Sequence, residues 1–411
     1  MIKRKALNAF WDAPYRPLFL SAFLYALLSV AWWPLGVQLG LPEPGLKPAV
    51  LWHVHELLFG FAAAAIAGYL LTALPGWTGR QPLRGPALKA LVSVWLLART
   101  ASAMDLPLAA ALFLNSAFFL ALYGYIFSEL AAARIHCKLG YAGAVLALGL
   151  GEAFFLVNAK AGNIWTCLNL AQSVLIGFLV LMFFIGARAI PAFTRNWLAL
   201  SGRSTLQVQE YPKTRAVSQV LLILALALKL AGAANAANVL LVAAAMAMFC
   251  SIPGWRTLAV LSNPLLAALH VAFLWLPAGA LLVGVTGLDL AGYPVSTAIH
   301  AITIGGMSGL VMAIAGRAGA HSSGGTMRAS KSFSIGVLLN GAAAWIRLSV
   351  PLFPALTDKL TVGAALLWCT GWLVFIAGFL PALSGPPRRP VLSGRRLIAQ
   401  DPTEPSAQAP E

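Results

Sequence analysis

The chain has 411 residues, of which 60% are hydrophobic and only 10% are charged, and its formal net charge is +16. Soluble domains carry roughly 25% charged residues, so this composition excludes an ordinary water-soluble protein. The basic residues stand in short loops between apolar segments, without the interleaved aromatic residues of a nucleic-acid-binding face. We therefore expect membrane lipid, and no nucleic acid, as the partner of this positive charge.

Apolar segments recur along the whole chain, each close to the length of about 20 residues that a helix needs to cross a bilayer. Proline, glycine and charged residues separate the segments. We predict an all-α fold, a polytopic membrane helical bundle of about twelve transmembrane helices that forms one domain, residues 1–383. The predicted spans are 17–36, 53–75, 86–104, 106–128, 140–158, 164–187, 216–233, 236–253, 264–286, 295–316, 331–350 and 360–383.

The first apolar segment is long and lacks a small-residue cleavage site, so we expect a retained helix rather than a removed signal peptide. Most Lys and Arg residues between spans fall on the side of the N-terminus. The opposite side keeps Lys47, Arg99, Lys160, Lys229, Arg347 and Lys359. This asymmetry predicts that both termini face the cytoplasm, N-in and C-in. Residues 384–411 are rich in Pro, Arg and Ser, which predicts a disordered cytoplasmic tail.

The second span opens with the run WHVHE, which places His53, His55 and Glu56 at the membrane. Ionisable side chains are costly in a bilayer, so those inside spans are candidates for function. Successive helical residues are about 100° apart, so His53 and His55 reach one ion only if the chain is extended or capped there. Glu56 starts a stripe of small residues at steps of four, which predicts that its carboxylate faces protein.

Five further ionisable residues lie within or just beyond the later spans. They are Glu152, His270, His300, Arg317 and His321. With the N-terminus inside, His53, His55 and His300 fall in the outer layer of the membrane. His270 and His321 fall in the inner layer. Because helical residues 300 to 321 span about 30 Å, one metal cannot collect all five histidines.

Neutral imidazole binds haem iron and copper, and a nearby carboxylate commonly fixes the imidazole tautomer. We interpret His53, His55 and His300 as candidate metal ligands, with His270 and His321 as a second set of cofactor-binding residues. Glu56, Glu152 and Arg317 are the supporting polar residues. The alternative is that each histidine only hydrogen-bonds a carbonyl group in a packed bundle.

Three runs carry a resemblance to a known family. Residues 15–20 (YRPLFL) resemble an RPFFL motif, 52–61 (WHVHELLFGF) resemble WHxHExxFGF, and 75–80 (PGWTGR) resemble PNWTGR of the NnrS family. His270, the run HAITIG from residue 300, Arg317 and His321 follow in the family's order. Residues 316–325 depart from the family's TRxxLGHTGRPL-like segment, although Arg317 and His321 remain.

The resemblance covers the chain up to about residue 383. It implies a haem- and copper-containing protein of the bacterial inner membrane that acts in nitric oxide metabolism, denitrification and protection from nitrosative stress. Nitric oxide or a nitrosyl species is then the expected ligand. The sequence does not decide whether the protein is an enzyme, which histidine binds which metal, or what donates electrons.

Two other functions stay open from the sequence. A polytopic transporter or channel without a redox cofactor agrees with the number of spans and the glycine-rich helices, although we find no internal six-plus-six repeat. The third function is substrate binding or metal delivery without turnover. A haem absorption band with stoichiometric metal in purified protein distinguishes the metalloprotein from the transporter.

Overall fold

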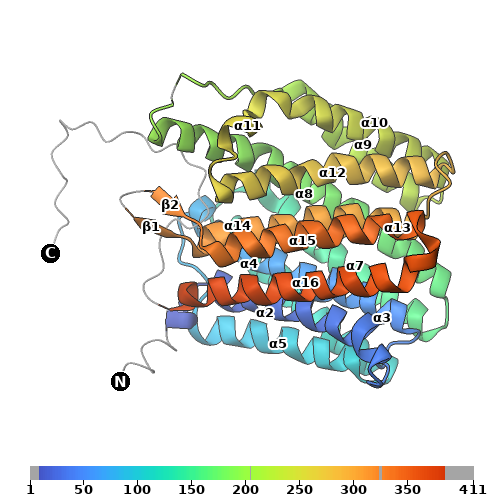
Figure 1. Ribbon diagram of the computed structural model, residues 1–411. Coiled ribbons are helices and arrows are strands. Elements are labelled where there is room, and N and C mark those ends of the chain that lie inside the picture. The colour runs from blue at the N-terminus through green and yellow to red at the C-terminus, as the bar shows by residue number, and fades with distance from the viewer. Residues whose placement is uncertain (1–8, 204, 324–325, 385–411) are drawn as a thin grey trace.

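The computed structural model describes residues 9–203, 205–323 and 326–384, which form one bundle of helices lying side by side (Figure 1). The tail predicted from residue 384 onward lies, apart from Ser384, outside the described residues. The first half contains α2 Tyr15–Val30, η1 Ala31–Gly36, α3 Ala49–His55, η2 Glu56–Phe61, α4 Ala62–Thr78, α5 Gly85–Ala103, α6 Leu108–Ala132, η3 His136–Lys138, α7 Leu139–Lys160 and α8 Ile164–Leu200.

The second half is also helical, except for one short hairpin. It contains α9 Pro212–Leu230, α10 Ala234–Ser251, η4 Pro253–Trp255, α11 Thr257–Val260, α12 Pro264–Gly287, α13 Val295–His300, η5 Ala301–Ser308, α14 Gly309–Gly319, β1 His321–Ser323, β2 Thr326–Arg328, α15 Lys331–Ser349, η6 Val350–Leu352, η7 Pro354–Leu356, α16 Thr357–Phe379 and η8 Leu380–Leu383. Strands β1 and β2 pair in antiparallel register, with His321 opposite Arg328. The all-α prediction is therefore confirmed, with this hairpin as a local exception.

Ten helical segments of the described chain are long and apolar enough to cross a membrane. The predicted spans 86–104 and 216–233 correspond to α5 and α9, which are not among the ten. Cationic residues lower the hydropathy of both helices, including Lys89 and Arg99 in α5 and Lys213 in α9. Both helices nonetheless pack in the bundle, α5 against α6 and α9 against α10 (Figure 1). The polytopic bundle is confirmed, and the count of twelve passes stays a prediction.

Helix α8 differs most from its predicted extent. It has 37 residues and continues to Leu200, although the apolar pattern predicts an end near residue 187. At about 1.5 Å per residue it rises about 55 Å, which exceeds the roughly 30 Å of a hydrocarbon core. One end of α8 must therefore extend beyond the hydrocarbon, and the charged residues Arg188 and Arg195 lie in its C-terminal part.

Two segments of the described bundle, η2 and η5, are π-helical, whereas η1 is interrupted by a kink at Trp33, whose backbone is extended. Such segments are rare and occur frequently at functional sites. Segment η2 follows His55 directly, and η5 follows His300 directly. Two of the three predicted spans that carry histidines thus share the same local distortion, directly after His55 and directly after His300.

Aromatic packing joins the first helix of the bundle to the last. Phe23 of α2 stacks on Trp372 of α16 at 5.3 Å between ring centroids, and Trp368 Nε1 donates to Ala26 O at 2.8 Å. At the helix ends, Arg16 Nη2 donates to Ser384 O at 3.3 Å. Both ends of the described chain therefore lie at one end of the bundle, as an even number of passes requires.

Candidate functional site

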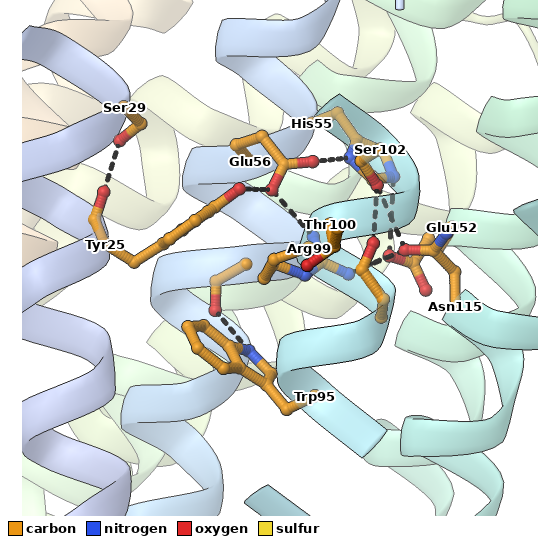
Figure 2. A network of polar contacts seen from close by, with 12 residues as sticks. Tyr25, Ser29, His55, Glu56, Trp95, Arg99, Thr100, Ser102, Asn115 and Glu152 are labelled. Carbon is orange, nitrogen blue, oxygen red and sulfur yellow. Dashed lines mark hydrogen bonds and ion pairs between the residues drawn. The ribbon is translucent and has the colours of Figure 1, made fainter. Parts of the chain in front are cut away.

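A cluster of charged and polar side chains lies inside the bundle, and each is at most 8% exposed (Figure 2). Five separate helical segments supply its members. The members are Tyr25 of α2, His55 and Glu56 at the junction of α3 and η2, Arg99 and Ser102 of α5, Asn115 of α6, and Glu152 of α7. We call this group the Arg99 cluster.

Glu56 is fully buried and is contacted on both carboxylate oxygens. Its Oε1 lies 2.6 Å from His55 Nδ1. Its Oε2 accepts hydrogen bonds from Tyr25 Oη and from Arg99 Nη1, the latter at 3.1 Å (Figure 2). A buried carboxylate requires such partners because the hydrocarbon offers none. The prediction that Glu56 faces protein is confirmed.

Arg99 joins Glu56 to the second buried carboxylate. Its Nη2 donates to Glu152 Oε1 at 2.9 Å and to Asn115 Oδ1 at 2.8 Å (Figure 2). The Asn115 oxygen also accepts from Ser102 Oγ at 3.2 Å. The planar, fixed fork of a guanidinium suits this bridging of two carboxylates on different helices.

The charges of the cluster balance only with one further proton. Glu56 and Glu152 contribute two negative charges and Arg99 one positive charge. His55 lies between the carboxylates, with Nε2 3.4 Å from Glu152 Oε1. A protonated His55 makes the four-residue group neutral, and neutrality limits the cost of burying charges away from water.

Small residues allow α2 to approach this cluster. A Cβ atom on Gly60 would lie 2.7 Å from the ring of Tyr25, and one on Gly68 would lie 2.8 Å from Phe19. The stripe of small residues that starts at Glu56 thus admits the helix that carries the Tyr25 hydroxyl. The predicted close approach of a second helix is present.

His53 and His55 point to different neighbours, as residues two apart on a helix do. The His53 ring lies 4.8 Å from the Trp33 ring, measured between centroids, and its Nδ1 is buried without a hydrogen-bond partner. His300 of α13 lies close enough to interact electrostatically with His53, and Arg347 of α15 interacts with both. The structure therefore brings His53 to His300 and places His55 in the Arg99 cluster.

His300 has a hydrogen bond on one ring nitrogen. Its Nδ1 lies 3.2 Å from Thr297 O, a carbonyl of its own helix. Neither Arg347 nor His300 forms an ion pair with a carboxylate among the described residues. Trp52, which precedes His53 in the chain, also has a buried Nε1 without a partner. We call His53, His300, Arg347 and Trp52 the histidine-pair site.

His270 occupies the other end of the bundle, as predicted for the inner layer. Its Nε2 lies 2.9 Å from Thr194 Oγ1 and its Nδ1 lies 3.0 Å from Thr257 Oγ1. Both ring nitrogens therefore have hydroxyl partners. This agrees with the alternative from the sequence, a histidine that ties helices together.

Arg317 and His321 lie at the end of α14 and in β1. The Arg317 guanidinium stacks on the Phe193 ring of α8, 4.0 Å from its centroid. The side chain of His321 is outside the described part of the structure. Within the described residues, no group of three or more His, Cys, Asp or Glu side chains is arranged to hold a metal ion.

Sequence reasoning missed three members of the Arg99 cluster, which are Tyr25, Arg99 and Ser102. Arg99 was assigned to the outer side of the membrane, but its side chain is 3% exposed and lies inside the bundle. A cation within the apolar segment 86–104 was the available signal, because such residues pair inside membrane bundles. Tyr25 gave no signal, since a tyrosine in an apolar span is equally typical of ordinary packing.

The comparison with known proteins agrees with the motifs. No curated protein matches the chain. The family model described as NnrS protein matches residues 9–387, nearly the whole length, and this span includes the Arg99 cluster and the histidine-pair site. The chain therefore belongs to the NnrS family.

Proposed function

We propose that this chain is a bacterial inner-membrane protein of the nitric oxide response that holds haem or copper through His53 and His300. The observation that carries the proposal is the buried, unpartnered Nδ1 of His53 beside a second imidazole from a distant helix. Family membership and the membrane-helical fold support the role in nitric oxide metabolism or nitrosative-stress protection.

The donor set fits such a cofactor. Imidazole nitrogen is a common ligand of haem iron and of copper. A buried polar atom without a partner is rare in proteins and is expected to bind something. By contrast, His270 has both nitrogens engaged, and His55 is held by Glu56 next to Glu152. His55 Nε2 also lacks a hydrogen-bond partner, but it faces Glu152 inside the Arg99 cluster, whereas His53 lies near a second imidazole, that of His300.

The surrounding residues have separate tasks in this proposal. A bound haem iron or copper ion supplies a coordination position for nitric oxide and a one-electron couple. Trp33 packs beside His53 and excludes water from it. Arg347 provides a positive charge for an anionic group of the cofactor. The Arg99 cluster fixes the helical turn that presents His53, because His55 and Glu56 belong to that turn.

The test is the cofactor content of purified variants. We expect His53→Ala and His300→Ala each to lose most of the haem absorption or most of the copper while remaining folded. His270→Ala and the loop variant His136→Ala are the matched controls and should keep both. The measurement is an absorption spectrum with metal analysis, before and after addition of nitric oxide.

Two results would count against the proposal. Normal haem and copper in both His53→Ala and His300→Ala would remove these residues as ligands. The absence of haem and copper from wild-type protein, made with adequate supply of both, would favour the transporter or channel that the sequence left open.

A further inference from the structure

We propose that a cavity near the Lys229 end of the bundle binds a small monovalent anion. The cavity has a volume of about 170 Å³ and lies between α8, α9, α10, α12 and α13. Since one buried water needs only about 10–15 Å³ of such space, a small ion with some of its hydration fits. Its polar lining residues are Lys229, Gln172 and Asn238.

Lys229 gives the cavity an uncompensated positive charge. Its Nζ donates to Gln172 Oε1 at 2.8 Å, which uses one of three ammonium N–H groups. No Asp or Glu is among the described residues that line the cavity, and no described carboxylate pairs with Lys229. Within the described part of the chain, the ammonium therefore has no carboxylate counter-ion.

Asn238 adds a second polar group to the cavity wall. Its side chain is 8% exposed and lines the cavity. It lies flat against Gly287, where a Cβ atom would come within 2.4 Å of Asn238 Nδ2. Glycine thus leaves room for the amide at the cavity wall. An amide carries two N–H donors, so Asn238 can donate a hydrogen bond to an anion in the cavity.

The rest of the wall favours a small anion over a larger organic acid. Most other lining residues are aliphatic, including Leu175, Ile176 and Leu241, and they strengthen the field of Lys229 by excluding water. Ala234, also in the wall, begins α10, and no side chain caps that helix. The positive end of the α10 dipole therefore adds to the same potential.

The cavity is separate from the histidine-pair site but adjacent to it along the chain. Ile299 and Ile302 line the cavity, and His300 lies between them in sequence. An anion beside Lys229 would thus occupy the layer of the bundle that contains His300. The proposal does not require a metal at His300, and the two can be tested independently.

The test is anion titration of the full-length protein in detergent. Sodium nitrate and sodium chloride serve as probes in a gluconate buffer of constant ionic strength, with binding followed by calorimetry and by the unfolding temperature. We expect saturable binding of one anion and a rise in the unfolding temperature. Lys229→Gln, which removes one charge-assisted partner, should weaken binding by about tenfold or more.

Three variants make the result specific. Lys160→Gln removes a lysine at the same end that is already paired with Asp105, 2.5 Å from Nζ to Oδ1, and should leave binding unchanged. Asn238→Leu should weaken anion binding although the charge of Lys229 remains. If Lys229→Gln does not fold, Asn238→Leu tests in its place whether the anion binds in this cavity. His300→Ala should bind the anion as tightly as wild type does. This result would show that the anion is not bound to a metal held by His300.

The proposal is wrong if wild-type protein shows no saturable binding. It is also wrong if Lys229→Gln, or Asn238→Leu in its place, binds as tightly as wild type. If His300→Ala lost anion binding while Lys229→Gln kept it, the anion would bind at the histidine-pair site and not in this cavity. That result would also overturn the proposal.

Discussion

Replacing Arg99 with Met is expected to lower the free energy of unfolding by about 3–5 kcal/mol, because two carboxylates then stay buried without their shared cation. Glu56 and Glu152 are both fully buried, and Arg99 contacts each within 3.1 Å. Arg99→Lys should recover only part of this loss, since an ammonium cannot reproduce the fork that also reaches Asn115. Thermal unfolding of the purified variants in detergent is the measurement.

The matched control is Arg80→Met at the surface of the bundle. Arg80 also pairs with a carboxylate, 2.6 Å from its Nε to Glu129 Oε2, but its side chain is 50% exposed. We expect a much smaller loss for this solvent-exposed pair than for Arg99, because water and salt screen it. In addition, Glu152→Gln should partly restore stability to Arg99→Met by removing one orphaned charge. Equal losses for Arg99→Met and Arg80→Met would show that Arg99 does not hold the cluster together.

Replacing Gly305 with Ala is expected to destabilise the protein by about 1–3 kcal/mol through overpacking. A Cβ atom on Gly305 would lie 2.3 Å from the ring of Trp275, which itself packs against Trp345 at 5.0 Å between centroids. The ring or segment η5 must therefore move. Because η5 begins directly after His300, the variant should also reduce the haem or copper content that we propose for this site.

Gly341→Ala is the control for the effect of a methyl group on a helix. Gly341 lies within α15, and a Cβ atom there would meet nothing within 4 Å. Since alanine favours the helix over glycine, this variant should be neutral or more stable by up to about 1 kcal/mol. Destabilisation of both variants to the same degree would argue against a specific contact with Trp275. The unfolding temperature and the cofactor content, measured together, separate the two effects.

The apolar pattern predicted the helical bundle well, and the four-residue stripe of small residues predicted the orientation of Glu56. Both predictions depend on local sequence, because hydrophobic length sets a span and small side chains set where helices meet. His53 and His270 contact different partners, Trp33 and Thr194, and the division of the histidines into two membrane layers stays a prediction.

Long-range pairing could not be predicted in the same way. Arg99 is 43 residues from Glu56 and 53 from Glu152, and nothing in one sequence indicates that these three side chains meet. Helix rotation explains why His53 and His55 point to different neighbours. That His53 lies near His300 depends on how α13 packs, which one sequence does not reveal. The extent of α8 was underestimated because hydropathy falls at Arg188 while the backbone remains helical.

The π-helical segments η2 and η5 have a consequence for insertions and deletions. A π-turn contains one residue more than the α-helical turn it replaces. Deleting a single residue from η5 would restore a regular helix and rotate the chain on one side of the deletion by about 100° relative to the other. His300 would then lose its present direction relative to Ser308, whose hydroxyl donates to Asn340 Oδ1 at 2.7 Å. The length of these turns is thus as much a requirement of the site as the identity of its histidines.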